Sequence, residues 1–171
     1  MIKPFYLRNP KASMRGKIAI GVMIFIIGIA MTFMLFIGII YCIYLYFDFK
    51  KLKSEFGILK ESAIKEFNNK NFKLCLECSR KGLELNNKDL VFEVLEALSL
   101  FNLKNYKDFI EIIERLNKNN KVRTDIDIQL KLGESYEILK ENLKAKETYK
   151  YLQGIFPKSI YLKEKIELLS K

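Results

Sequence analysis

The chain has 171 residues and a net charge of +10, from 30 Lys and Arg against 20 Asp and Glu. Hydrophobic residues make up 50% of the sequence. It contains no His, and His is the commonest general base and transition-metal ligand. Lys and Glu are interspersed rather than gathered on one stripe, so the basic balance indicates a solvated surface and no nucleic-acid interface.

An apolar run dominates the N-terminal third. Residues 18–47 contain no Asp, Glu, Lys or Arg, and about 20 apolar residues suffice for a helix to cross a bilayer. The run therefore predicts a single transmembrane helix, an uncleaved signal anchor that follows a basic tail over residues 1–17. Aromatic residues typical of a membrane interface cluster near its end: Tyr41, Tyr44 and Tyr46.

Flanking cations predict the orientation of this anchor. The positive-inside rule counts Lys and Arg close to the ends of a membrane helix. Five precede the run and three follow it directly: Lys3, Arg8, Lys11, Arg15 and Lys17, then Lys50, Lys51 and Lys53. We therefore expect a single-pass inner (cytoplasmic) membrane protein with a cytoplasmic N-terminus and a periplasmic, extracytoplasmic C-terminal domain, joined by a short linker over residues 48–57.

The remaining chain, residues 58–171, is predicted to be all-helical. Apolar residues recur three and four positions apart, as at Phe109, Ile112, Ile113 and Leu116, which is the period of an amphipathic helix. Asn-rich breaks separate the segments, and no Pro occurs between Pro10 and Pro157. We expect short helices joined by tight turns, with a capping helix over residues 158–169.

An internal repeat appears when the chain is shifted on itself by 34 and then 36 residues. Small residues align first, at Ala63, Ala97 and Gly133. Further alignments follow at three positions: Phe72, Tyr106 and Asn142; Cys75, Phe109 and Ala145; Gly82, Leu116 and Leu152. The spacing is that of a helix–turn–helix unit, with small residues where its two helices cross.

At this spacing the chain resembles the tetratricopeptide repeat (TPR) family over about residues 58–157. The third unit carries the pattern best, at Leu132, Gly133, Tyr136, Leu139, Ala145, Tyr149 and Pro157. The resemblance implies a TPR-like α-solenoid of about three helix–turn–helix repeats. Units of this kind stack because none can bury its apolar face alone.

The resemblance also implies a concave groove that is lined by the first helix of each unit. Its expected residues are Ile64, Phe67, Asn68, Val94, Leu98, Phe101, Asn102, Leu130, Glu134 and Glu137. A mostly apolar groove with an acidic end suits an amphipathic helix or an extended apolar segment of a partner protein. Packing of the same residues against the domain's own helices, or against a second copy, is the alternative.

No residue pattern predicts catalysis or a cofactor. None of the motifs G-x-x-x-x-G-K-[ST], G-x-G-x-x-G and G-x-S-x-G occurs in the sequence, so no enzymatic activity is expected. Cys75 and Cys78 form a C-x-x-C pattern inside an expected helix, with too few further ligands for zinc. Both are interpreted as packing residues.

The expected function is that of a membrane-anchored scaffold that holds a partner during assembly of a bacterial envelope complex, such as a flagellar motor, a secretion or translocon apparatus or cell-wall machinery. The alternative is a chaperone-like or receptor module for transiting polypeptides. A third possibility is self-association into a homo-oligomer, because Gly21, Gly28 and Thr32 fall near one helix face and small residues permit close helix contact.

Overall fold

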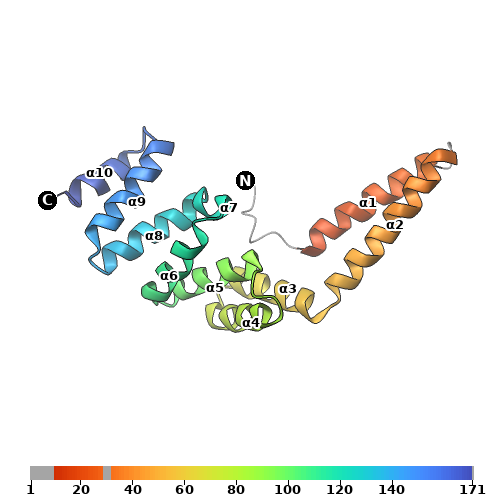
Figure 1. The fold of residues 1–171 in the computed structure, drawn as a ribbon, viewed down its shortest axis with the longest axis horizontal. Helices are drawn as coiled ribbons and strands as arrows, with labels where there is room; N and C mark the ends of the chain where they lie inside the picture. Colours follow the sequence, from red (N-terminus) through yellow and green to blue (C-terminus); the bar gives the residue numbers. More distant parts are fainter. Residues whose placement is uncertain (1–9, 29–31, 171) are drawn as a thin grey trace. The chain divides into compact units, whose positions relative to one another are not determined.

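The structure is a computed structural model that describes the backbone of residues 10–28 and 32–170 and the side chains of residues 14–26 and 36–170. Every element in this part of the chain is a helix, which confirms the all-α expectation (Figure 1). The chain divides into an N-terminal unit, residues 1–92, and a C-terminal unit, residues 93–171. The two units are described separately.

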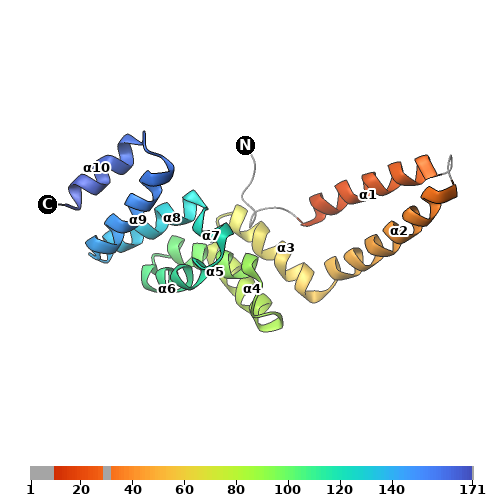
Figure 2. The ribbon, with the colours of Figure 1, turned by 45° about the horizontal axis from the view of Figure 1, so that its top comes forward.

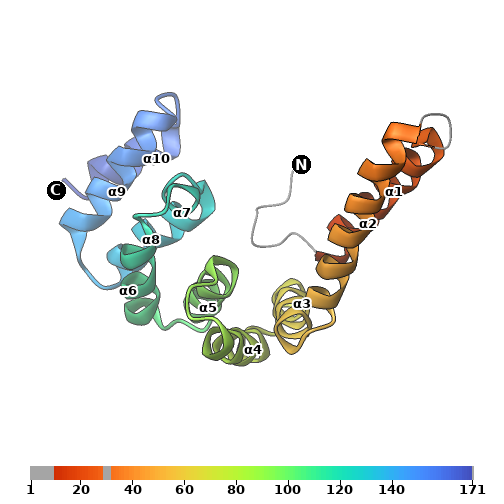
Figure 3. The ribbon, with the colours of Figure 1, turned by 45° about the vertical axis from the view of Figure 1, so that its right-hand side comes forward.

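The apolar run forms a helical hairpin in place of one continuous helix. α1 (Pro10–Gly28) and α2 (Thr32–Leu52) lie side by side (Figures 1 and 3). The prediction of one transmembrane helix over residues 18–47 is therefore wrong. Within residues 10–28 and 32–170, no helix combines the length and the apolar character that crossing a membrane requires. This finding also contradicts the predicted single-pass inner-membrane topology with an extracytoplasmic domain.

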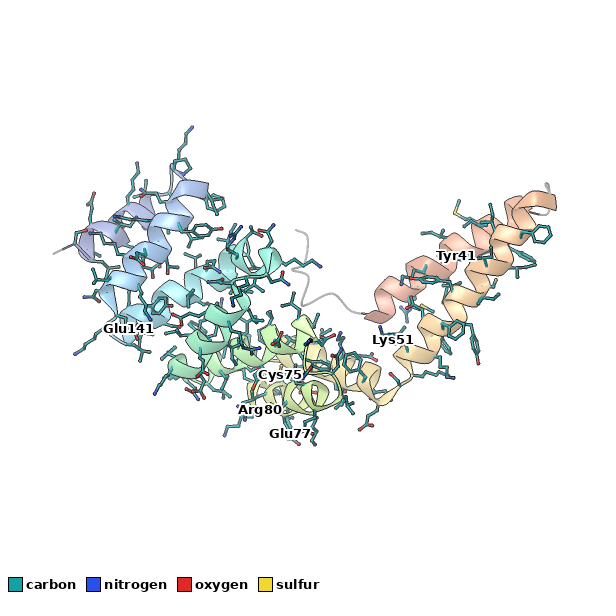
Figure 4. The ribbon with its side chains drawn as sticks, in the orientation of Figure 1. Tyr41, Lys51, Cys75, Glu77, Arg80 and Glu141 are labelled. Carbon is teal, nitrogen blue, oxygen red and sulfur yellow. The ribbon has the colours of Figure 1, made fainter. Side chains whose placement is uncertain are left out.

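Contacts between the two helices explain why the run folds back on itself. Gly21 leaves room for the Tyr41 ring, whose Cε1 lies 2.7 Å from where a Cβ on Gly21 would stand. The Tyr41 hydroxyl (Figure 4) donates a hydrogen bond of 2.6 Å to the carbonyl oxygen of Lys17. The Lys17 ammonium donates to the Tyr44 hydroxyl at 3.1 Å and forms an ion pair with Asp48.

The predicted self-association face is thus partly used inside the hairpin. Gly21 packs against α2 of the same chain. Gly28 and Thr32, the other two residues of that face, lie outside the residues whose side chains are described.

The remaining helices follow one another as short antiparallel pairs. In the N-terminal unit, α3 (Glu55–Asn68) packs on α4 (Phe72–Leu85) (Figure 2). α5 (Leu90–Asn102) begins there and continues into the C-terminal unit, where α6 (Tyr106–Leu116) and the short α7 (Asn120–Arg123) follow it. The C-terminal unit ends with α8 (Ile126–Ile138), α9 (Asn142–Ile155) and α10 (Ile160–Leu168), the last close to the predicted capping helix.

The turns inside the pairs share one backbone geometry. Lys70, Lys104 and Lys140 have φ of 62°, 64° and 62°, and they are separated by the same 34 and 36 residues as the sequence repeat. In the first turn, the Lys70 N–H donates to the Phe67 carbonyl and the Asn71 N–H to the Glu66 carbonyl, at 3.0 and 2.9 Å. The other two turns repeat both bonds, so each is a Schellman closure of the preceding helix.

Four helices are capped in the same way at their N-termini. A Ser or Asp side chain accepts a hydrogen bond from a main-chain N–H one turn into the helix, which satisfies a donor that the helix itself leaves unpaired. These N-capping residues stand before α3, α5, α8 and α10: Ser54, Asp89, Asp125 and Ser159.

Small buried residues allow the helices of a pair to approach closely. Ala63, Ala97 and Gly133, aligned by the repeat, are all buried. A Cβ on Gly133 in α8 would stand 2.6 Å from Cε1 of the buried Tyr149 in α9. The separation of α8 and α9 therefore depends on a residue without a side chain.

We expect Gly133→Ala to lower the free energy of unfolding by about 1–3 kcal/mol, because the added methyl overpacks a filled contact. Gly154→Ala is the matched control, since a Cβ there meets nothing within 4 Å. Alanine should instead raise stability at that helical position by about 0.5–1 kcal/mol. Urea unfolding followed by circular dichroism measures both, and equal effects would contradict the close contact.

A second stability prediction concerns the cap of α8. Burial raises the pKa of the Asp125 carboxyl above that of a solvent-exposed Asp, although the hydrogen bond from the Ile128 N–H opposes this increase. A carboxyl whose pKa is higher in the folded state stabilises the fold at low pH, and that contribution is lost as pH rises through the folded pKa. Asp125→Asn should therefore raise Tm at pH 7 and have little effect at pH 3.5, because Asn caps equally well. An equal gain at both pH values would refute this.

Candidate partner-binding site

An apolar cleft opens in the C-terminal unit between α8, α9 and α10. Its volume is about 570 Å³, within the range of roughly 300–1,000 Å³ that is common for binding pockets. We call it the apolar cleft, and it is lined by Ile126, Leu130, Leu152, Ile155, Phe156, Pro157, Lys158, Ser159, Tyr161 and Leu162.

The floor and the rim of the cleft differ in exposure. Leu152 and Leu162 are buried and form the floor. Ile126, Ile155 and Tyr161 lie at the rim and remain 43%, 45% and 44% exposed. Large apolar side chains grouped at a concave surface mark an interaction site more strongly than the same residues scattered singly.

Local structure fixes the mouth of the cleft. Only four residues, 156–159, connect α9 to α10. Within them, the Ser159 N–H donates to the Phe156 carbonyl at 3.0 Å, and the Ser159 hydroxyl accepts from the Leu162 N–H at 3.4 Å. This tight connection sets α10 beside α9, and its four residues themselves line the cleft.

The connection between α6 and α8, in the same unit, is longer and contains a helix. Nine residues, 117–125, join α6 to α8 and include the short helix α7. α7 contacts both of its neighbours (Figure 3), and its Val122 is completely buried. At that step the chain covers its own apolar surface with a short helical segment, whereas the step from α9 to α10 carries no such segment.

Charge at the cleft has one sign. Lys158 is the charged residue among those lining it. It is exposed and lies in the connection before α10. A partner segment with apolar side chains and an adjacent carboxylate would therefore complement both the wall and its edge.

The predicted groove residues are divided between the two units. Ile64, Phe67 and Asn68 belong to the N-terminal unit and the other seven to the C-terminal unit. Ile64, Val94 and Leu98 are buried, so their side chains contribute to packing.

Four of these groove residues take part in contacts beside the turns. Phe67 and Phe101 stack edge-on against Phe72 and Tyr106, with ring centroids 5.6 Å apart in both pairs. Asn68 and Asn102 donate side-chain hydrogen bonds to carbonyls four residues earlier in their own helices. The equivalence of these contacts follows the sequence repeat.

The last three groove residues lie on α8. Leu130 also lines the apolar cleft, and Glu134 is half-buried. Both carboxylate oxygens of Glu137 lie 2.8 Å from the Lys165 ammonium on α10, and the Tyr149 hydroxyl donates to the same carboxylate. Leu130 thus joins the expected groove to the observed cleft, while the groove as a binding surface stays a prediction.

Sequence reasoning missed the rim of the cleft. Ile126, Ile155, Phe156 and Tyr161 were not among the expected site residues. The available signal was the contrast between a long connection after α6 and a short one, with Pro157, after α9. That contrast shows in the sequence only once the ends of the helices are known.

A second hollow in the C-terminal unit, of about 400 Å³, is polar. Its groups pair with one another. The Tyr136 hydroxyl donates to Glu114 at 2.5 Å, Lys144 donates to the same oxygen at 3.3 Å, and Gln129 donates to Asn117 at 2.8 Å. The hydrogen bond from Tyr136 lowers the pKa of Glu114, and burial together with Glu114 raises the pKa of Tyr136. Such mutual satisfaction is typical of a structural network.

Cys75 and Cys78 both lie on α4, where Figure 4 labels Cys75. Cys75 is buried, with its sulfur 4.0 Å from the Ser79 hydroxyl. Burial raises the pKa of the Cys78 thiol, whereas reactive cysteines have a lowered pKa. Among the residues that the structure describes, no three His, Cys, Asp or Glu side chains group closely enough to hold a metal ion.

Comparison of the chain with protein-family models, with curated proteins and with solved structures finds no match. Assignment to the tetratricopeptide repeat family therefore remains a prediction from residue spacing. The apolar cleft is therefore the basis of the functional proposal.

The Glu137 contacts give a testable consequence. The hydrogen bond from Lys165 to Glu137 raises the pKa of that lysine, and burial raises the pKa of Tyr149. Removing the carboxylate charge by Glu137→Gln should lower the free energy of unfolding by about 1–3 kcal/mol, because two donors lose a charged acceptor. Glu167→Gln on the exposed face of α10 is the control and should change it by less than about 0.5 kcal/mol. Chemical denaturation that gave equal losses for both variants would refute the role of Glu137.

Proposed function

We propose that this protein is a helical-repeat adaptor that binds another protein through the apolar cleft of its C-terminal unit. The observation that carries the proposal is the group of large apolar side chains left open at the rim, above a buried apolar floor. Burying such surface provides about 25 cal/mol per Å² removed from water. Helix–turn–helix pairs with repeated turns and caps are compatible with a TPR-like solenoid, whose usual role is protein binding.

The proposed occupant is an amphipathic helix that carries an acidic side chain beside its apolar face. Two features favour a helix of this chemistry. Between α6 and α8, the short helix α7 packs on both of these helices and buries Val122, so a helix already packs against helices of this unit. Lys158 then places a cation at the edge of the open cleft, where a carboxylate of the partner could lie.

A photocrosslinking residue placed at Tyr161 in cells should capture the partner, whereas the same residue at Leu143 should not. Leu143 is the matched control because it is 80% exposed on α9 and does not line the cleft. Mass spectrometry then identifies the crosslinked peptide, which should be amphipathic and acidic. Equal capture of that peptide from both positions would contradict the proposal.

A synthetic peptide with the crosslinked sequence provides the decisive affinity measurement. Ile155→Asp should weaken binding at least about tenfold, because it places a charge against an apolar contact. Lys158→Glu should weaken it several-fold, and the effect should diminish at high salt. Leu143→Asp should bind like the unchanged chain. If many unrelated peptides bind the cleft with similar affinity, a dedicated adaptor is excluded and the chaperone-like alternative is favoured.

A further inference from the structure

Between residues 18 and 47, the described side chains that the α1–α2 hairpin exposes to solvent are mostly large and apolar. On α2, Tyr41 and Leu45 are turned toward Gly21 of α1. The remaining faces of α2 carry large side chains that are exposed to solvent: Phe36, Ile37, Ile39, Ile40, Tyr46 and Phe49. A helix that is apolar around most of its circumference is typical of one surrounded by an apolar medium.

α1 shows the same property. Six apolar side chains of this helix are between 45% and 63% exposed: Ile18, Ile20, Val22, Met23, Phe25 and Ile26. At 100° per residue they cover about 220° of its circumference. A second copy of the hairpin would cover one side of this surface and leave the others in water. The distribution of apolar side chains therefore favours a surrounding lipid phase over a single protein partner.

Charge is confined to the open end of the hairpin, which we call the hairpin base. Residues 18–47 carry no Asp, Glu, Lys or Arg. At the base, Lys17 and Asp48 neutralise each other in an ion pair across the two helices. Lys50 and Lys51 on α2 then follow, and both are exposed; Figure 4 labels Lys51.

The length of the apolar arms fits a limited depth of insertion. With a rise of 1.5 Å per residue, residues 18–28 extend about 16 Å and residues 32–47 about 24 Å. The hydrocarbon core of a bilayer is about 30 Å thick, so one leaflet contributes about 15 Å. The shorter arm matches the depth of one leaflet, and the last turns of the longer arm, with Tyr44 and Tyr46, then lie at headgroup level.

A pocket at the hairpin base combines apolar walls with cations. Its volume is about 490 Å³, and it lies between the hairpin and the start of α3 within the N-terminal unit. Ile18, Phe49, Leu52 and Ile58 supply apolar walls, with Met14 and Glu61 also in the lining. Arg15 and Lys53 supply two cations and Glu61 one carboxylate, so the lining keeps an excess of positive charge. A lipid with an anionic headgroup complements this arrangement of an acyl-compatible wall and positive charge.

We propose that the hairpin inserts its apolar arms into one leaflet of an anionic phospholipid bilayer and places its base among the headgroups. The hairpin enters and leaves on the same side, so neither helix crosses the membrane. The site is separate from the apolar cleft. Failure of this inference therefore leaves the proposed adaptor function unaffected, and the converse also holds.

Flotation of the full-length chain with lipid vesicles tests the insertion. The chain should float with phosphatidylcholine vesicles that contain about 30 mol % phosphatidylglycerol, and at least about fivefold less should float with pure phosphatidylcholine. Ile40→Glu/Phe47→Glu should reduce flotation at least tenfold. Leu143→Glu, which adds charge at an exposed apolar site far along the sequence on α9, should float like the unchanged chain.

The cations of the pocket give a second, independent variant. Arg15→Glu/Lys53→Glu should abolish the preference for the anionic vesicles and leave weak binding to the neutral ones. Far-ultraviolet circular dichroism of each variant should retain the helical signal of the unchanged chain. The proposal is overturned if the unchanged chain stays unbound with both vesicle types, if the hairpin variants float as well as the Leu143 control, or if crosslinking finds the hairpin covered by a second copy.

Discussion

The spacing between paired helices rests on contacts between a glycine and an aromatic ring. Gly133 on α8 leaves room for the Tyr149 ring on α9, and Gly21 on α1 does the same for Tyr41 on α2. The two helices of each pair can therefore approach more closely than two ordinary side chains would permit. Where α8 stands relative to α9 decides which of their residues face inward and which remain at the edge of the pair. The position of the apolar cleft follows from this spacing.

α10 is held in place by a different kind of contact. The Lys165 ammonium binds both oxygens of Glu137 at 2.8 Å, which ties α10 to α8 across the end of α9. The same carboxylate accepts from Tyr149, the ring that packs on Gly133. Glu137 on α8 therefore contacts both α9, through Tyr149, and α10, through Lys165. An adaptor that must present a preformed surface benefits from such a rigid arrangement, because little order has to be gained on binding.

The part of the fold that could be predicted from sequence is the part that depends on local signals. Small residues at Ala63, Ala97 and Gly133 gave the repeat spacing, and the turns at Lys70, Lys104 and Lys140 follow the same spacing. The fate of residues 18–47 could not be predicted from their length and apolar character. One helix and two packed helices satisfy that pattern equally, and the pairing of Lys17 with Asp48 that distinguishes them is a long-range contact. The cleft was not predicted because it lies beside the short connection between α9 and α10, which contains no helix such as α7.

The three Schellman turns have a consequence for how the chain reaches this structure. Each is closed by main-chain hydrogen bonds between residues at most five positions apart in the chain. Closing so short a loop costs little conformational entropy, and the contacts that reward it lie in the adjoining helices. Folding rates rise as contacts become more local in sequence. Each turn can therefore close as soon as its two helices have been synthesised, and the stacking of neighbouring pairs then completes the burial of their apolar faces.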